Sequence, residues 1–219
     1  MGRFAFSSGL GNGAFELKTR VMPLIALLTP LLLFQSAGAP SSESARTAAC
    51  LARIETAPAD AYEDALAWLG QGARPGARQC AALALIALGH EGDGALRLEE
   101  LANAKDAGSL AERAVYLAQA GNAWLLAGQP EAALTALANA LKLAPSDPAL
   151  RVDRARAYLA LKQWDEAGAE LDAANELLPG QAQTLFLRAK ALKELGRLAD
   201  AWSDIEAARA ADAKTIDIL

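Results

Sequence analysis

One stretch of the chain holds residues that could bind a metal ion. His90, the single histidine, is followed by Glu91 and Asp93, and an imidazole beside carboxylates is a ligand set that zinc uses in proteins. The same residues also suit a solvated loop between two helices, and the neighbouring Gly92 and Gly94 favour that interpretation. A metal-binding or enzymatic module at this loop is therefore a remote hypothesis, and we expect no bound metal.

Other patterns that would indicate catalysis are missing. The sequence contains no HExxH, GxSxG or CxxC motif and no glycine-rich phosphate-binding loop. Two cysteines, Cys50 and Cys80, are present, but no histidine is placed in sequence to activate either of them as a nucleophile. We expect no catalytic residue, no cofactor and no enzymatic activity.

Alanine and leucine dominate the 219-residue chain. Hydrophobic residues make up 53% of it but aromatic residues only 5%, and alanine and leucine are strong helix formers. Runs of β-branched or aromatic residues that would predict strands are few. The net charge of −5 argues against a nucleic-acid partner. The composition predicts an all-α protein with one sizeable core.

Residues 114–147 carry a spaced pattern of small and apolar side chains that two helices would position. With Ala114 as position 1, positions 4, 7, 8, 11, 15, 20, 24, 27 and 32 hold Leu117, Ala120, Gly121, Trp124, Gly128, Ala133, Leu137, Ala140 and Pro145. This pattern closely resembles the 34-residue tetratricopeptide repeat (TPR). The resemblance implies a right-handed superhelix of about five stacked antiparallel helix hairpins with a concave groove.

The 34-residue frame extends in both directions from this stretch. Three repeats fill residues 114–215, and two degenerate repeats, starting at 46 and 80, fill residues 46–113. A tail of 216–219 remains. In the second degenerate repeat Glu99 stands at position 20, where two helices cross closely and a small residue is expected. We therefore expect the frame to slip there by a residue or more.

The first 39 residues have a different character. Lys18 and Arg20 precede an apolar run from Val21 to Phe34, and small residues follow. This order is typical of a secretory signal peptide, so residues 1–39 are interpreted as an N-terminal extension and signal peptide, and 40–45 as a short leader. The apolar run is shorter than the ~20 residues that a membrane span needs.

The signal segment predicts a periplasmic or secreted protein that meets a membrane only if the segment stays uncleaved. Three alternatives are open: a cytoplasmic protein with an apolar N-terminus, different cleavage points near Gly38 and Ala39, and translation from Met22.

The resemblance also implies where a partner would bind. In TPR proteins the first helix of each repeat lines the groove, mainly at positions 2, 5, 9 and 12. Positions 5, 6 and 9 of the last three repeats supply the candidate partner-binding residues Gln119, Asn122, Asp153, Arg156, Phe186 and Lys190. They would form a mildly basic strip beside an apolar one, suited to a protein or peptide with an acidic group. The alternative is a solvated face without a ligand.

One known mode of TPR binding is not expected. The repeats that hold the C-terminal carboxylate of chaperones need lysine at position 5 of one repeat and asparagine at position 6 of the next. Ala118 and Asp153 stand at those places here. Asn122 matches the pattern, but the carboxylate clamp is incomplete.

The same resemblance bears on the cysteines and tryptophans. Because neighbouring first helices pack side by side in a TPR array, Cys50 and Cys80 could form a disulfide; two buried thiols are the alternative. Trp124 and Trp164 stand at core positions, whereas Trp68 and Trp202 are expected to be partly exposed.

The functional prediction is a non-catalytic protein–protein interaction scaffold or adaptor. The first alternative is a self-assembling structural protein. No capping helix follows the last repeat, so the helix expected at 198–210 must expose one face or dock on another copy. The sequence gives neither the partner nor the pathway.

Overall fold

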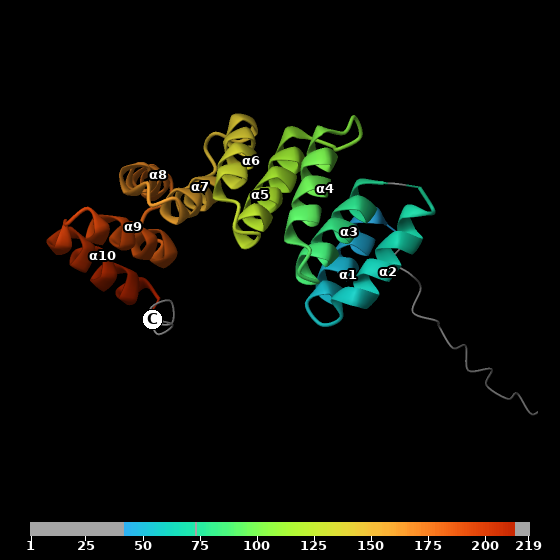
Figure 1. Cartoon of the computed structure of the whole chain (residues 1–219), viewed down its shortest axis with the longest axis horizontal. Coiled ribbons are helices and arrows are strands. Elements are labelled where there is room, and N and C mark those ends of the chain that lie inside the picture. The colour runs from blue at the N-terminus through green and yellow to red at the C-terminus, as the bar shows by residue number, and fades with distance from the viewer. Residues whose placement is uncertain (1–41, 73, 213–219) are drawn as a thin grey trace, which may run out of the picture. The chain divides into compact units, whose positions relative to one another are not determined.

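The computed structural model describes residues 42–72 and 74–212, which all belong to one compact unit. The expected signal peptide, most of the leader and the tail lie outside the described residues. Within the described ranges the chain forms ten helices and no strand (Figure 1). In chain order these are α1 (Glu43–Ile54), α2 (Pro58–Leu69), α3 (Pro75–Ala87), α4 (Glu91–Asn103), α5 (Leu110–Leu126), α6 (Pro130–Leu143), α7 (Pro148–Ala160), α8 (Trp164–Leu177), α9 (Ala182–Glu194) and α10 (Leu198–Ala211).

Consecutive helices pair into hairpins, from α1–α2 to α9–α10. The second helix of each hairpin also packs against the first helix of the next, and first helices touch in the pairs α1–α3, α5–α7 and α7–α9. The expected all-α fold of stacked helix hairpins is confirmed. None of the described helices combines the length and the apolar character needed to cross a membrane.

Proline and capping residues determine where many helices begin. α2, α3, α6 and α7 each start with proline at the first helical position, where the missing N–H would have had no partner within the helix. Before α5, the Ser109 hydroxyl accepts a hydrogen bond from the Glu112 N–H at 3.3 Å, and the Glu112 carboxylate accepts one from the Ser109 N–H at 2.7 Å. These local signals act independently of the 34-residue period.

The turn inside four of the hairpins contains a left-handed residue. The backbone angle φ is 85° at Gly89, 69° at Gly128 and 76° at Gly196, a region that glycine enters without steric cost. Lys162 holds the same place between α7 and α8 with φ of 59°. The turn residue of a hairpin is position 15 of its repeat. Counting back fourteen residues from each of these four turn residues places the repeat starts at 75, 114, 148 and 182.

The second repeat therefore starts five residues before its expected start at 80, and position 20 is Gly94 rather than Glu99. A Cβ added to Gly94 would meet the Cγ1 atom of Ile86 and lie 2.7 Å from the carbonyl oxygen of Ala82. The close crossing of α3 and α4 requires glycine at this point. The expectation of a small residue at position 20 holds once the frame is moved.

The frame moves because five residues are inserted between the end of α4 and position 1 of the third repeat, and they include the first turn of α5, which starts at Leu110. The third repeat begins 39 residues after the second, five more than the usual 34. Within the inserted segment Ala107 is fully buried. Arg113 of α5 donates hydrogen bonds to the carbonyl oxygens of Ala102 and Ala104, at 2.9 and 2.8 Å. The insertion is thus folded onto the array rather than left as a free loop.

Helix α1 has no buried residue and is held mainly through polar and ring contacts. The Glu43 carboxylate accepts a hydrogen bond from the Gly76 N–H at 3.1 Å, and the Arg46 guanidinium lies 4.5 Å from the centre of the Trp68 ring. Trp68 is only 5% exposed, so the expectation of partial exposure was wrong. It is buried because it packs in a cluster with Ala65, Ala77, Cys80 and Ala81.

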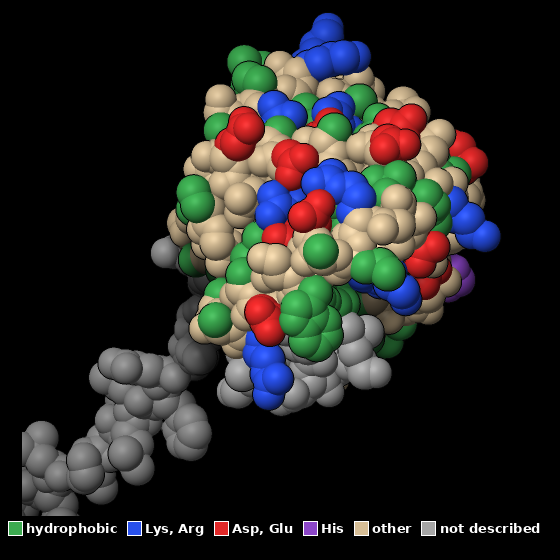
Figure 2. Space-filling view, turned by 90° about the vertical axis from the view of Figure 1, so that its left-hand side faces the viewer, with side chains coloured by type: hydrophobic (Ala, Val, Ile, Leu, Met, Phe, Trp, Pro, Cys, Tyr) green, Lys and Arg blue, Asp and Glu red, His purple; other side chains and the backbone are tan. Residues whose placement is uncertain are grey.

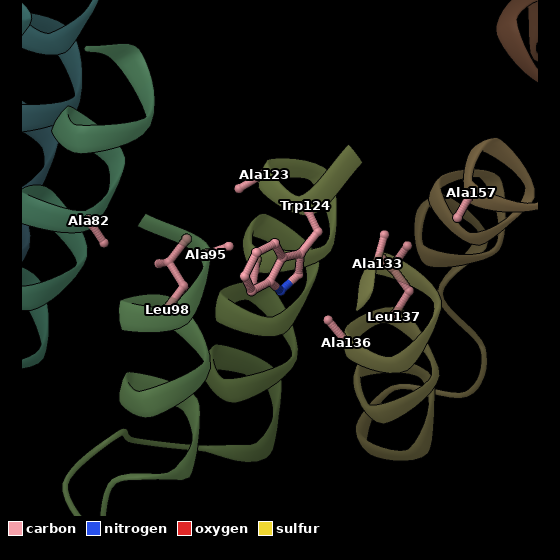
Figure 3. Close-up of a cluster of buried hydrophobic side chains, with 10 residues drawn as sticks. Ala82, Ala95, Leu98, Ala123, Trp124, Ala133, Ala136, Leu137 and Ala157 are labelled. Atoms are coloured by element: carbon pink, nitrogen blue, oxygen red, sulfur yellow. The ribbon is translucent and has the colours of Figure 1, made fainter. Parts of the chain in front are cut away.

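The main apolar cluster lies in the middle of the array, across α3 to α7. Trp124 of α5 lies between the helices that carry Leu98 and Ala136 (Figure 3). Alanines make up most of the rest of the cluster and allow the helices to approach closely. At the crossing of α5 and α6, a Cβ on Gly121 would lie 2.5 Å from the Cγ atom of Leu137. The core therefore depends on small residues at fixed positions as much as on large ones.

Candidate functional site

The predicted groove residues lie on three neighbouring first helices. α5 carries Gln119 and Asn122, α7 carries Asp153 and Arg156, and α9 carries Phe186 and Lys190. Helix α7 contacts both α5 and α9, so residues at matching repeat positions come close together. The structure brings some of the six into direct contact and leaves others in separate pairs.

Three of the six form one polar network between α5 and α7. The Asn122 amide donates a hydrogen bond to one oxygen of Asp153 at 2.9 Å, and the Arg156 guanidinium donates to the other oxygen at 2.9 Å. The Asp153 side chain is 15% exposed and that of Arg156 is 35% exposed. This network therefore joins neighbouring repeats, and Arg156 is already paired with a carboxylate of its own chain.

Burial raises the pKa of Asp153 above its ordinary value. The hydrogen bond from Asn122 and the positive charge of Arg156 act in the opposite direction but do not cancel the effect. A carboxylate that is removed from water loses more hydration than its partners return, so its charged form is disfavoured. The network connects α5 to α7, and burial disfavours the charged form of Asp153 within it. It is therefore not an open anion site.

The other three predicted residues lie outside the Asp153 network, and each makes a hydrogen bond or a cation–π contact with another side chain. Gln119 accepts a hydrogen bond from the Gln79 amide of α3 at 3.0 Å, which links two further repeats. The Lys190 ammonium lies 5.6 Å from the centre of the Phe186 ring, within the range of a cation–π contact. Lys190 is exposed while Phe186 is partly buried, so this pair presents a cation above an aromatic surface.

Two hollows flank the α7–α9 strip. One has a volume of about 230 Å³ and is bordered by Val152, Asp153 and Arg156 of α7 and by Gln183 and Thr184 of α9. The other, of about 380 Å³, lies at the opposite ends of these helices and is lined by Leu159, Ala160, Trp164, Lys190, Lys193 and Glu194. Each hollow offers polar side chains beside apolar ones, as a peptide site does.

Apart from Lys190, the second hollow is lined by residues that are not among the six predicted partner-binding residues. Lys193 and Leu159 stand at position 12, which the TPR pattern already marks as groove-lining, and Trp164 is the first residue of α8. The side chain of Lys193 makes no hydrogen bond or ion pair within residues 42–72 and 74–212. The position-12 signal was available in the sequence, and it marks an exposed lysine of this hollow whose ammonium group has no partner among the described residues.

Comparison with known proteins agrees with this architecture. Residues 125–190 match the sequence model of the tetratricopeptide repeat family. MamA from Desulfovibrio magneticus RS-1 has 15% identity over 80% of this chain and 95% of its own, with a TM-score of 0.66. A kinesin light chain of Podospora anserina with TPR-like repeats has 20% identity, 77% and 93% coverage, and a TM-score of 0.64. Residues 125–190 are tetratricopeptide repeats, and the other described hairpins share their architecture.

A third TPR structure shares less of the fold. The first TPR domain of Spaghetti (RPAP3), bound to an HSP90 peptide, has 25% identity over 46% of this chain and 79% of its own, with a TM-score of 0.45. That likeness is too distant to bear on what this chain binds.

The two cysteines of the TPR array are joined. Cys50 of α1 and Cys80 of α3 form a disulfide, with their Cα atoms 6.0 Å apart. Of the two alternatives that the sequence left open, the structure has the bonded one. The bond ties the least buried helix, α1, to the neighbouring repeat.

The His90 loop does not assemble a metal site. His90 precedes α4, and Glu91 and Asp93 fall in its first turn, where the helix dipole favours acidic side chains. Among the described residues, no group of three or more His, Cys, Asp or Glu side chains is placed to hold a metal ion. The local charges have a structural explanation in the helix start.

Two larger hollows lie elsewhere on the array, and each is lined by an arginine that is paired with a carboxylate. In one, of about 550 Å³, Arg78 pairs with Asp106 at 2.6 Å, and this hydrogen bond lowers the pKa of Asp106. In the other, of about 440 Å³, Arg188 donates to Asp204 at 2.7 Å and to Asp172 at 2.9 Å. These hydrogen bonds and charges raise the pKa of Arg188. The first pair joins α3 to the segment before α5, and the second cluster joins α9 to α8 and α10. The first hollow also contains three charged side chains that have no ion pair among the described residues, namely Asp93, Arg97 and Glu100.

Proposed function

We propose that the protein is a non-catalytic interaction scaffold that binds an extended peptide carrying acidic and apolar side chains along α7 and α9. The TPR fold supports a binding role, because stacked hairpins present one continuous surface of first helices. The observation that carries the proposal is the pair Lys190 and Lys193, one turn apart beside the hollow that Trp164 and Leu159 line.

The chemistry of this surface favours one class of peptide. Two lysine ammonium groups without a carboxylate partner attract acidic side chains. Trp164, Leu159 and the Phe186 ring offer apolar contact at the same place. A peptide with carboxylates spaced between leucine or phenylalanine residues would pair with the lysines and also fill the apolar surface. Arg156 contributes less than predicted, since Asp153 already neutralises it.

A binding experiment tests this proposal. Labelled ten-residue peptides of alternating Glu and Leu, and a matched set with Lys in place of Glu, would be titrated with the full chain by fluorescence anisotropy. We expect the acidic set to bind and to weaken with salt. The double variant Lys190→Ala/Lys193→Ala should bind about tenfold less tightly, which is about 1.4 kcal/mol.

Lys142→Ala provides the matched control, because Lys142 is an exposed lysine on α6 that contacts only Asn139 among the described residues. Its affinity should equal that of the unmodified chain. Equal binding of basic and acidic peptides, or an unchanged affinity for the double variant, would reject the proposed surface.

We also propose that the chain works outside the cytoplasm, in the periplasm or at the envelope. The basic–apolar–small order of residues 18–39 supports export. The disulfide between Cys50 and Cys80 is consistent with it, since such bonds persist in oxidising compartments. Cell fractionation that finds the protein with reduced cysteines in the cytoplasm would contradict this proposal.

A further inference from the structure

Helix α10 exposes two large apolar side chains. Leu198 is 65% exposed and Trp202 is 66% exposed; they stand one turn apart on the last helix that the structure describes. The Trp202 indole N–H donates to Glu206 on the same helix at 3.0 Å, so no other element holds the ring. Figure 2 looks onto the α8–α10 side, where hydrophobic side chains lie among charged ones at the surface.

The matching position is covered in α4 and α6, whereas in α8 it is Gly168, where a Cβ would meet nothing within 4 Å. Position 21, which Trp202 occupies, holds Ala95 in α4 and Leu134 in α6. Ala95 is fully buried, and Leu134 packs against the central cluster, which includes Ala157 of α7. They are covered because the first helix of the next hairpin packs on α4 and on α6. Trp202 is exposed because no described helix follows α10.

Helix α1 shows the complementary feature. Position 10 of a first helix is an alanine in four repeats, and all four are 0–1% exposed: Ala84, Ala123, Ala157 and Ala191. Ala157 belongs to the same buried cluster as Ala133 and Leu137 of the preceding helix α6 (Figure 3). In α1, counted from residue 42, this position is Leu51, which is 37% exposed. The face of α1 that a preceding hairpin would cover is therefore open.

We propose that α1 of a second copy packs on α10, continuing the array from one molecule to the next. The contact repeats the geometry by which α7 packs on α6 and α9 on α8. Leu134 and Ala157 belong to one apolar cluster at the α6–α7 contact, and by the same repeat positions Trp202 of one copy would lie near Leu51 of the other. The neighbouring exposed residues of α1, Ser44, Ala48 and Ala52, are small and leave room for the large indole.

This contact is heterologous, because two different faces meet. Each added copy leaves one free α10 and one free α1, so the assembly grows into chains or closes into a ring. An α10-to-α10 dimer would instead use the same face twice and stop at two copies. The two arrangements differ in whether α1 takes part, which can be tested directly.

The test compares the full chain with Trp202→Glu and Leu51→Glu by light scattering over a range of concentrations. We expect the mass of the unmodified chain to rise with concentration. Either substitution alone should weaken association at least about tenfold, as the loss of a central apolar contact does. Both side chains are exposed, so circular dichroism should show unchanged helix content.

An equimolar mixture of the two variants gives the decisive result. Trp202→Glu keeps its α1 face and Leu51→Glu keeps its α10 face, so together they should form a dimer that grows no further. Leu126→Glu, a change at a 69% exposed leucine of α5, should associate like the unmodified chain.

Three results would overturn the proposal: a monomer at every concentration, normal association of Leu51→Glu, or no dimer in the mixture. Association through residues 1–37 would leave both variants unaffected and would count against it as well.

Discussion

The carboxylate of Asp153, a residue predicted to contact a ligand, accepts hydrogen bonds from two other predicted groove residues. Sequence position placed Asn122, Asp153 and Arg156 on the groove face, and all three lie on the predicted helices. Their contacts could not be predicted, because they depend on which rotamers bring α5 and α7 side chains within 2.9 Å. The free cation of the strip, Lys193, stands at a groove position that the residue pattern also marks.

The raised pKa of Asp153 gives a testable pH dependence. The folded state holds this proton more tightly than the unfolded chain, whose carboxyl titrates near the ordinary value of 3.8. As pH rises from 3.8 through the folded pKa, this group therefore lowers the free energy of unfolding, and the loss persists at neutral pH. Replacement by asparagine removes the titration.

We expect Asp153→Asn to gain stability relative to the unmodified chain as pH rises through this window, measured by urea unfolding at several pH values. Asn122→Ala removes a hydrogen bond that lowers this pKa, so it should lose stability more steeply over the same range. Parallel stability curves for all three proteins would show that the Asp153 carboxyl does not titrate differently on folding.

At the scale of the helix hairpin, glycine decides how closely two helices cross. Gly94 of α4 has no room for a Cβ beside Ile86 and the Ala82 backbone, whereas a Cβ on Gly168 of α8 would meet nothing within 4 Å. Both glycines lie inside helices, where alanine is intrinsically better by roughly 0.5–1 kcal/mol. The surroundings should therefore reverse the sign of the same substitution.

We expect Gly94→Ala to lower the free energy of unfolding by about 1–3 kcal/mol, as overpacking does. Gly168→Ala should raise it by roughly 0.5–1 kcal/mol. Thermal and urea unfolding of the two variants would measure both changes. A stabilised Gly94→Ala variant would mean that α3 and α4 separate easily at their crossing.

The sequence predicted the helices of the last three repeats better than those of the first two. In repeats four and five, α7 and α9 start at the expected residues 148 and 182. Upstream of residue 114 the fixed period failed, because it cannot detect the five residues inserted there, which lengthen the connection and the start of α5. Gly89 at position 15 and Pro75 at a helix start were local signals that could have located the second repeat.

At the scale of the array that residues 42–72 and 74–212 form, each hairpin contacts only its neighbours, apart from a few weak contacts. The stability of such an array is approximately a sum over repeats and their interfaces. A change at one end should therefore be felt most by the nearest hairpins. The Cys50–Cys80 disulfide lies at the α1 end of the array, and α1 itself has no buried residue. The disulfide should therefore matter most for the first hairpin.

We expect Cys50→Ala/Cys80→Ala to destabilise the first hairpin by about 3.7 kcal/mol, the loop-closure effect for a sequence separation of 30 residues. Amide hydrogen exchange followed by mass spectrometry should show faster exchange in α1 and α2 and little change from α5 to α10. Uniformly faster exchange along the chain would indicate that the array unfolds as one cooperative unit instead.

The disulfide also determines how the described array would respond to tension. A pull applied at Glu43 passes along the backbone to Cys50 and then crosses the sulfur–sulfur bond to Cys80. Helix α2 lies in the closed loop between these residues and is left out of the line of force. The later hairpins contain no disulfide, so stretching would unfold and extend them. Helix α2 would carry no tension, and the residues of the closed loop would add almost no length.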